Sequence, residues 1–188
     1  MWACPSLTSI DLSGLTQLNT IGNCFMWECE SLTSIDLPGV TQLTTIDDGF
    51  MGYCVSLKSI VLSPFKNIVS IGSNFMINCT SLTSIDLSGF TQLIRIDDNF
   101  MRDCDNLKSI NFSGLTQLTI GNNFMRDCYN LKSIDFSGLT QLTYGNKFLE
   151  NCSSLIDIKC SKDIESKLPK IIPLENKFKG NIRYIIPI

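Results

Sequence analysis

Cysteine recurs along this chain at an almost constant interval, and no other feature restricts the fold as strongly. The interval is 25 residues up to Cys104 and 24 afterwards, because TQLIRIDDNF at 91–100 becomes TQLTIGNNF at 116–124, one residue shorter. The column comprises Cys4, Cys29, Cys54, Cys79, Cys104, Cys128 and Cys152. A period in the twenties is typical of a solenoid, in which each repeat is one coil and only its neighbours complete its core.

Each repeat contains two apolar segments, as in CESLTSIDLPGVTQLTTIDDGFMGY at 29–53. In the first, L-x-x-I-x-L places Ile35 between the polar Ser34 and Asp36, an alternation that predicts a short strand with one buried face. The second set, Val40, Leu43 and Ile46, predicts another extended segment on a different side of the coil. The first pattern recurs at Leu7/Ile10/Leu12, Leu57/Ile60/Leu62, Leu82/Ile85/Leu87, Leu107/Ile110/Phe112 and Leu131/Ile134/Phe136.

Two further columns mark turns. Glycine follows the first strand at Gly14, Gly39, Gly89, Gly114 and Gly138, with Pro64 in the coil that lacks it, and indicates a bend that a side chain would obstruct. Residues suited to a helix N-cap precede a motif Phe-Met-x-x-Cys, at Asn23, Asp48, Ser73, Asp98, Asn122 and Asn146. Each coil is therefore predicted to run strand, turn, strand, turn and one helical turn.

Aromatic side chains are expected to stack along the axis. The phenylalanines of the motif, Phe25, Phe50, Phe75, Phe100, Phe124 and Phe148, would form a spine through coils about 4.8 Å apart, the spacing of neighbouring strands. The cysteines beside them are interpreted as small buried side chains, since free Cys is among the most buried residue types. Cys24 differs, because it occupies a polar turn position held elsewhere by Gly, Asn or Lys, and is expected to be an exposed thiol.

The array is predicted to cover residues 1–160 in about seven coils, followed by a C-terminal capping segment at 161–188. SKDIESKL predicts a short helix with Ser161 as its cap and Pro169 at its end, and KIIPLENKFKGNIRYIIPI predicts a hairpin. Only three residues precede Cys4. The N-terminal end is therefore expected to be bare, covered by an upstream region, or paired with another molecule.

Composition narrows the classes of function. Net charge is −3 without a basic cluster in the repeats, which argues against nucleic acid. The chain has no His, the commonest general base and metal ligand, and no nucleophile elbow or phosphate-binding glycine loop. The paired Asp47-Asp48 and Asp97-Asp98 match no calcium motif. We therefore expect no enzymatic activity, no cofactor and no metal, and no apolar run is long enough for a transmembrane segment.

The repeat resembles the BspA-like leucine-rich repeat family. The similarity rests on L-x-x-I-x-L, a turn of Ile-Gly or Ile-Asp, and Phe-x-x-x-Cys, over roughly residues 4–160. It departs from the usual pattern in having Phe-Met before the Cys and a slightly longer unit. The resemblance implies a leucine-rich-repeat solenoid that forms a single domain. Its strands would be parallel and joined by short helical turns, which makes it a β-rich α/β fold. Strands would line a concave face. It also implies a surface or secreted protein that binds other proteins.

Two surfaces are candidates for binding a protein partner. The exposed side of the first strands would present Ser34, Asp36, Ser59, Ser84, Asp86, Ser109, Asn111, Ser133 and Asp135, interrupted by Val61. Repeat arrays commonly bind along such faces, although uniform columns suit a repetitive partner better than a unique one. The alternative is the edge at the Phe-Met-x-x-Cys motif, where Trp27, Tyr53, Arg102, Arg126 and Tyr129 vary from coil to coil.

The sequence therefore predicts a non-enzymatic protein–protein interaction module, with adhesion or surface recognition as the role that the resemblance implies. The alternative is a structural protein that assembles end to end through its uncapped N-terminal coil. Localisation stays divided, because the resemblance favours the cell surface whereas MWACPSLTSIDL has no signal-peptide pattern, which favours the cytoplasm.

Overall fold

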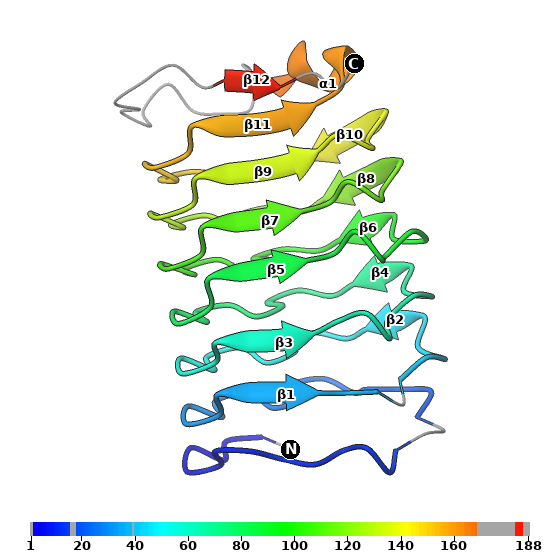
Figure 1. Cartoon of the computed structure of the whole chain (residues 1–188), viewed down its shortest axis with the longest axis vertical. Coiled ribbons are helices and arrows are strands. Elements are labelled where there is room, and N and C mark those ends of the chain that lie inside the picture. The colour runs from blue at the N-terminus through cyan, green and yellow to red at the C-terminus, as the bar shows by residue number, and fades with distance from the viewer. Residues whose placement is uncertain (1, 16–17, 39, 169–182, 186–188) are drawn as a thin grey trace.

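The computed structural model describes residues 2–15, 18–38, 40–168 and 183–185. The chain winds into a column of coils stacked one above another (Figure 1). Starting each coil at its cysteine, coils 1 to 6 are residues 4–28, 29–53, 54–78, 79–103, 104–127 and 128–151, and a partial coil 7 begins at 152. The predicted solenoid with parallel strands is confirmed.

Each coil from 2 to 6 contributes one strand to either side of the column. The front strands are β1 (Ser34–Asp36), β3 (Ser59–Val61), β5 (Ser84–Asp86), β7 (Ser109–Asn111), β9 (Ser133–Phe136) and, from coil 7, β11 (Asp157–Cys160). The back strands are β2 (Thr45–Ile46), β4 (Ser70–Ile71), β6 (Arg95–Ile96), β8 (Gln117–Ile120) and β10 (Gln141–Tyr144). Both predicted extended segments are thus present, although no strand forms in the described part of coil 1.

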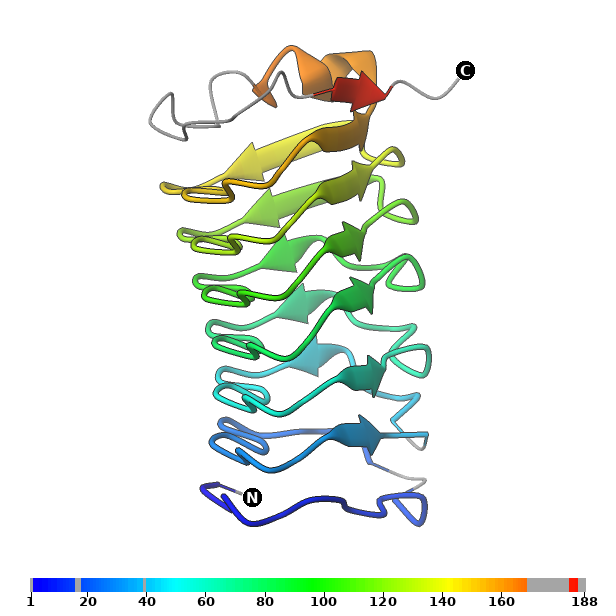
Figure 2. The same ribbon diagram turned by 60° about the vertical axis from the view of Figure 1, so that its left-hand side comes forward.

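Register explains why the sequence repeats. Strands pair in parallel with their counterparts one coil away, so that Ile110 lies beside Ile134 and Ile71 beside Ile96. Identical side chains therefore stack on one another, and each buried column is continuous through the molecule. Figure 2 shows the front and back strands on opposite sides of the column, with the core between them.

The phenylalanine spine is formed as predicted. Successive rings from Phe25 to Phe148 lie with centroids 5.1 to 5.5 Å apart and are inclined by 3° to 17°. Phe75 and Phe100 are fully buried in this stack. Offset stacked rings contribute beyond the area they bury, so the spine is a major source of cohesion between coils.

The turn after each back strand is not helical, which corrects the predicted helical turn. Every second residue there has a positive φ, for example Asn74 at 60°, Met76 at 48° and Asn78 at 57°. A right-handed helix needs consecutive negative φ values, so this alternation excludes one. The amide of Met76 instead donates to the carbonyl of Phe50 one coil below, at 2.8 Å. We call this ladder between coils the turn edge; it spans 72–78 in coil 3.

The predicted N-cap column also has a different role. Asp48 Oδ1 accepts a hydrogen bond from the backbone N–H of Ser73 in the next coil, at 2.7 Å, and Asp98 accepts one from Asn122 at 2.7 Å. The next position carries an asparagine ladder, in which Asn123 donates to Asn99 and Asn99 to Asn74, both at 2.9 Å. These side chains join coils rather than begin helices.

The cysteine column is buried, as predicted. The thiols of Cys54, Cys79, Cys104, Cys128 and Cys152 each donate to the carbonyl of a Met 27 or 28 residues earlier in the chain, at 3.1 to 3.2 Å. All nine cysteines are free thiols. Burial raises the pKa of Cys54 to about 12, and that of Cys104 lies well above its ordinary value for the same reason. Cys24 has a positive φ in its turn and is half-buried rather than fully exposed.

The C-terminal segment begins as the sequence predicts. Helix α1 (Lys162–Glu165) follows Ser161, whose hydroxyl donates to the Leu139 carbonyl instead of capping the helix. Ile164 and Leu168 are fully buried against the last coils. Strand β12 (Arg183–Ile185) pairs in parallel with β11, and the other arm of the predicted hairpin lies outside the described residues. The boundary between array and cap stays a prediction.

The spine yields a stability prediction. Phe75→Ala or Phe100→Ala should lower the free energy of unfolding by about 3–5 kcal/mol, because a large cavity opens in a core that neighbouring coils cannot collapse into. Urea denaturation followed by circular dichroism measures the change. A loss below about 1 kcal/mol would show that the stacked rings do not hold the coils together.

Buried thiols make stability fall at alkaline pH. Unfolded thiols ionise near 9.0, whereas folded Cys54 remains protonated to about 12, so the stabilisation is complete below pH 9 and is lost as pH rises toward 12. Each such thiol should remove about 1.4 kcal/mol per pH unit in that window. Urea midpoints measured under reducing conditions at about pH 7.5 and pH 10 give the slope. Unchanged midpoints would contradict the burial.

Candidate functional site

The front sheet forms one face of the column and carries the first set of predicted binding residues. Ser34, Asp36, Ser59, Ser84 and Asp86 are exposed on β1, β3 and β5. Their counterparts on β7 and β9, Ser109, Asn111, Ser133 and Asp135, are half-buried. The structure therefore brings all nine residues to one face, with the more accessible ones toward the N-terminal half.

Most carboxylates of this face have a structural partner. The Oδ1 of Asp86 accepts a hydrogen bond from the Ser88 amide at 2.9 Å, and Asp135 accepts one from Ser137 at 2.9 Å. Such Asx turns end the strand and start the bend toward the back sheet. Asp36 has no equivalent bond, because the residue two positions on is Pro38, which has no N–H.

Charge on the face is balanced at its C-terminal end. Lys159 lies 3.2 Å from Asp135, and Arg183 forms two hydrogen bonds to Asp157 at 2.7 and 2.9 Å. Burial would raise the pKa of Asp135, but hydrogen bonds from Ser137 and Lys159 outweigh it and lower that pKa. The acidic strip that the sequence predicts is therefore limited to the N-terminal half of the face.

The front sheet is split between coils 3 and 4. β1 pairs with β3, and β5 pairs with β7, but β3 and β5 belong to separate sheets with no backbone pairing between them in the described residues. Figure 1 shows a wider gap there than between any other neighbouring front strands. The back sheet is unbroken at the same level, where β4 pairs with β6. Coils 3 and 4 are thus joined at the back and separated at the front.

The burial of apolar side chains and the closeness of neighbouring backbones also change between coils 3 and 4. Ile60 is half-buried, whereas Ile35, Ile85 and the later members of its column are buried. A methyl group built at Gly114 would lie 1.8 Å from the Ser88 carbonyl oxygen, so the coils meet closely there. At Gly89, one coil earlier, nothing lies within 4 Å. The glycine column therefore reflects close approach at Gly114 and Gly138, but not at Gly89 or Gly14.

The sequence of coil 3 accounts for the split. Val61 replaces the Asp or Asn of the other described front strands of coils 2 to 6 and leaves an exposed apolar side chain at the end of β3. Pro64 takes the glycine position, where its fixed φ and missing N–H restrict the bend. The corner of coil 3 consequently follows a different path from that of coil 4, and the front strands do not meet.

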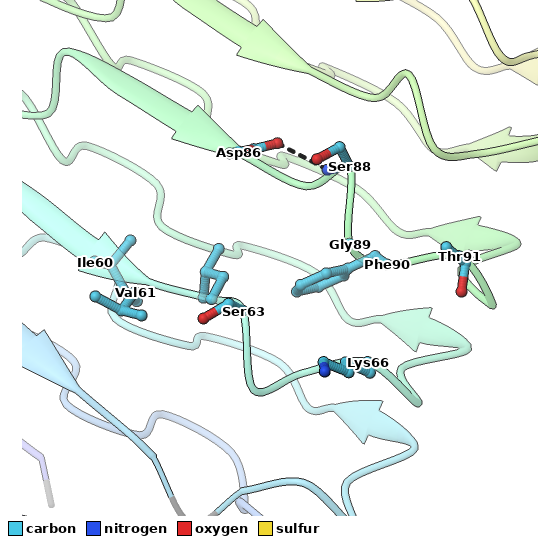
Figure 3. Close-up of a pocket in the computed structure, with 10 residues that line it drawn as sticks. Ile60, Val61, Ser63, Lys66, Asp86, Ser88, Gly89, Phe90 and Thr91 are labelled. Carbon is cyan, nitrogen blue, oxygen red and sulfur yellow. Dashed lines mark hydrogen bonds between the residues drawn. The ribbon is translucent and has the colours of Figure 1, made fainter.

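Two cavities lie along the split. The larger, about 480 Å³, is bounded by Val61, Lys66, Asp86 and Phe90 among others and is drawn in Figure 3. The second, about 360 Å³, lies between Lys58, Ile60 and Ile85 and shares Asp86 with the first. Val61 is 47% exposed at the rim. From the sequence, Val61 is expected only to interrupt the polar columns of the front face. Val61, Pro64 and Lys66 all depart from the repeat within one coil, and this clustering is the signal that could have located the cavities.

The alternative surface, at the turn edge, is more packed than the sequence predicts. Trp27 is half-buried, not exposed: its ring lies over Gly52 and 5.1 Å from the ring of Tyr53. Tyr53 and Tyr129 are exposed at this edge. Aromatic contact area is thus available here, but one of its three aromatics serves the packing of coils.

Both predicted arginines of the turn edge are engaged in ion pairs. Arg102 lies 3.1 Å from Asp103, and Arg126 lies 3.2 Å from Asp127 and 2.6 Å from Glu150. Burial raises the pKa of Asp103 despite its Arg102 partner. A partner that used these arginines would have to displace existing carboxylates.

The described residues include no group of three or more Asp, Glu, Cys or His side chains placed to hold a metal ion. None of the helices in the described ranges has the length and apolar character needed to cross a membrane.

Parallel strands in register, one repeat apart, with stacked Leu, Ile and Phe columns define a leucine-rich-repeat solenoid. Residues 2–118 and 90–169 match the family described as BspA type leucine rich repeat region (6 copies). The chain therefore belongs to the BspA-type leucine-rich repeat family, which confirms the resemblance drawn from the sequence.

One solved structure is similar: the crystal structure of a leucine-rich repeat protein from Bacteroides ovatus, 16% identical, with a TM-score of 0.33. The match covers 86% of this chain and 56% of that one, so the chain spans little more than half the length of that relative. A likeness at this score carries no argument about function. No curated protein matches the chain.

The Asx turns of the front face yield a matched pair of substitutions. Asp86→Ala should lower the free energy of unfolding by about 1 kcal/mol through loss of the bond to Ser88, whereas Asp36→Ala should cost less than about 0.5 kcal/mol. Urea denaturation of both variants beside the native chain measures the difference. Equal losses would show that these aspartates do not hold the bends.

Proposed function

We propose that this chain is a non-enzymatic protein-binding module that contacts its partner through the front sheet. The observation that carries the proposal is the placement of all nine predicted side chains on one face, fixed by parallel pairing one coil apart. Membership in a leucine-rich repeat family supports a role as an interaction or scaffold protein. Recognition at a cell surface, including adhesion, is the finer role that we propose from the same membership.

The front face suits recognition for a physical reason. Its side chains project from a backbone held by strand pairing, so little conformational entropy is lost when a partner binds. Exposed Ser34, Ser59 and Ser84 offer hydroxyl groups on one face, and Asp36 offers a carboxylate without an internal bond to another described residue. The half-buried C-terminal positions contribute less accessible surface.

Substitutions on the front face, compared with matched substitutions on the back side, test the proposal. Ser34→Arg/Ser84→Arg/Ser133→Arg alters the front face without removing an Asx turn. The matched control, Thr44→Arg/Gln117→Arg/Gln141→Arg, adds the same charge to exposed positions of the back side. Each variant is used as bait in an extract of the encoding organism, after circular dichroism has shown native secondary structure.

We expect a partner captured by the native chain and by the control to be reduced at least tenfold with the front-face variant, because three bulky cations disrupt a close interface. Equal capture by both variants would contradict binding through the front sheet. The turn edge, with Tyr53, Tyr129 and the paired arginines, would then be tested in the same way.

A second function, end-to-end self-assembly, is favoured by one observation. Apolar side chains of coil 1, including Leu7, Ile10, Leu12 and Phe25, are only partly buried, whereas their coil 2 counterparts are buried. A second copy stacked on coil 1 would cover them. Sedimentation at increasing concentration should then show growing oligomers, and a constant monomer would contradict this role.

A further inference from the structure

We propose that the split between β3 and β5 binds an extended peptide segment of a protein partner. In this proposal the segment places an apolar side chain over Ile60 and Val61 and pairs its backbone with the edge of β3 or β5. The inference rests on the proposed protein-binding function and names the site and the chemistry of the segment.

Unpaired strand edges carry the first part of the argument. Among the described front strands, β7, β9 and β11 have parallel partners on both sides, and β1 has one, toward β3. β3 and β5 also have one partner each, and their facing sides have none. An open edge presents backbone donors and acceptors that pair readily with an added strand. Here the two edges are enclosed within the face instead of lying at its ends, so access is restricted to a slender, extended chain.

Incomplete burial of apolar side chains carries the second part. Ile60 is the one member of its column between coils 2 and 7 that is not buried, and Val61 beside it is 47% exposed. The adjoining cavities, of about 480 and 360 Å³, are large enough for an apolar side chain. A partner side chain that covered Ile60 and Val61 would remove their apolar surface from water, which favours binding.

The distance between β3 and β5 limits how the segment can bind. A strand paired on both sides would need its neighbours about 9.6 Å apart, twice the ordinary strand spacing. Cα atoms of β3 and β5 come within 8 Å of each other. A segment paired with either edge lies in the plane of the sheet between β3 and β5, so it can bind only when these edges part by at least about 1.6 Å. The bonded back sheet and turn edge would act as the hinge.

Flanking groups define the pattern of the segment. Strand β1 pairs with β3, and β7 pairs with β5, through Ser-Ile-Asp and Ser-Ile-Asn. These partners lie on the far sides of β3 and β5, so a segment with the same polar–apolar–polar pattern would continue the isoleucine column across the split. Lys66 and Asp86 lie on opposite sides of the larger cavity in Figure 3, so the rim tolerates either charge beside the apolar residue.

A peptide copied from the chain itself is the probe. The fluorescein-labelled sequence SLTSIDLSGF (81–90) has the required pattern, and its binding to the full chain is followed by fluorescence anisotropy. Val61→Arg places a cation over the cavity. Val69→Arg is the matched control, since Val69 is 39% exposed on the back side of the same coil.

We expect the native chain and Val69→Arg to bind the peptide equally and Val61→Arg to bind at least tenfold more weakly. A peptide methylated on its isoleucine nitrogen should also bind more weakly, because it loses a backbone donor. Absence of binding up to millimolar peptide, or equal binding to both variants, would overturn the inference.

Photo-crosslinking locates the bound peptide. With a diazirine in place of the isoleucine side chain, crosslinks are expected at residues 58–62 or 84–90. Crosslinks confined to coil 1 would overturn the inference. These assays need no natural partner, so their failure would leave the front-face proposal standing, whereas failure of the front-face capture experiment would not affect them.

Discussion

Burial of apolar columns between neighbouring coils is the interaction on which the structure depends. A single coil of about 25 residues has two very short strands and cannot enclose its own Leu, Ile and Phe side chains. Stacking converts each residue type into a column, and the rings from Phe25 to Phe148 form the longest aromatic one. The repeat in the sequence is a consequence, because each coil must present apolar side chains at the same positions to the coils above and below it.

Polar groups also form hydrogen bonds with groups one coil away. The turn edge adopts alternating positive φ values that cost energy for residues such as Met76, and it persists because each amide finds a carbonyl one coil away. Asp48, Asp98 and the asparagine ladder add side-chain bonds in the same direction. Hydrogen bonding along the axis therefore continues where strands are absent.

The periodicity of the sequence predicted the fold correctly. Local residue preferences predicted a helical turn after each back strand, and that prediction was wrong. The strands and the Phe and Cys columns follow from spacing alone. Asp48 and Asp98 suggested helix caps, but they accept amides of the next coil. The residues at the following position, such as Asn74 and Asn99, adopt a positive φ, which Asn tolerates. The split could not be derived from one coil, since it arises where Val61 and Pro64 of coil 3 face Gly89 of coil 4. The departure from the repeat was visible; its effect on packing between coils was not.

Amide hydrogen exchange of the free native chain tests the central claim, that coils 3 and 4 are joined at the back and separated at the front. The account predicts fast exchange for amides of β3 and β5 that face the split, with slow exchange at Ile71 and Ile96 on the back side of the same coils. Protection at 59–61 and 84–86 equal to that of β7 and β9 would contradict it, because the front sheet would then be continuous.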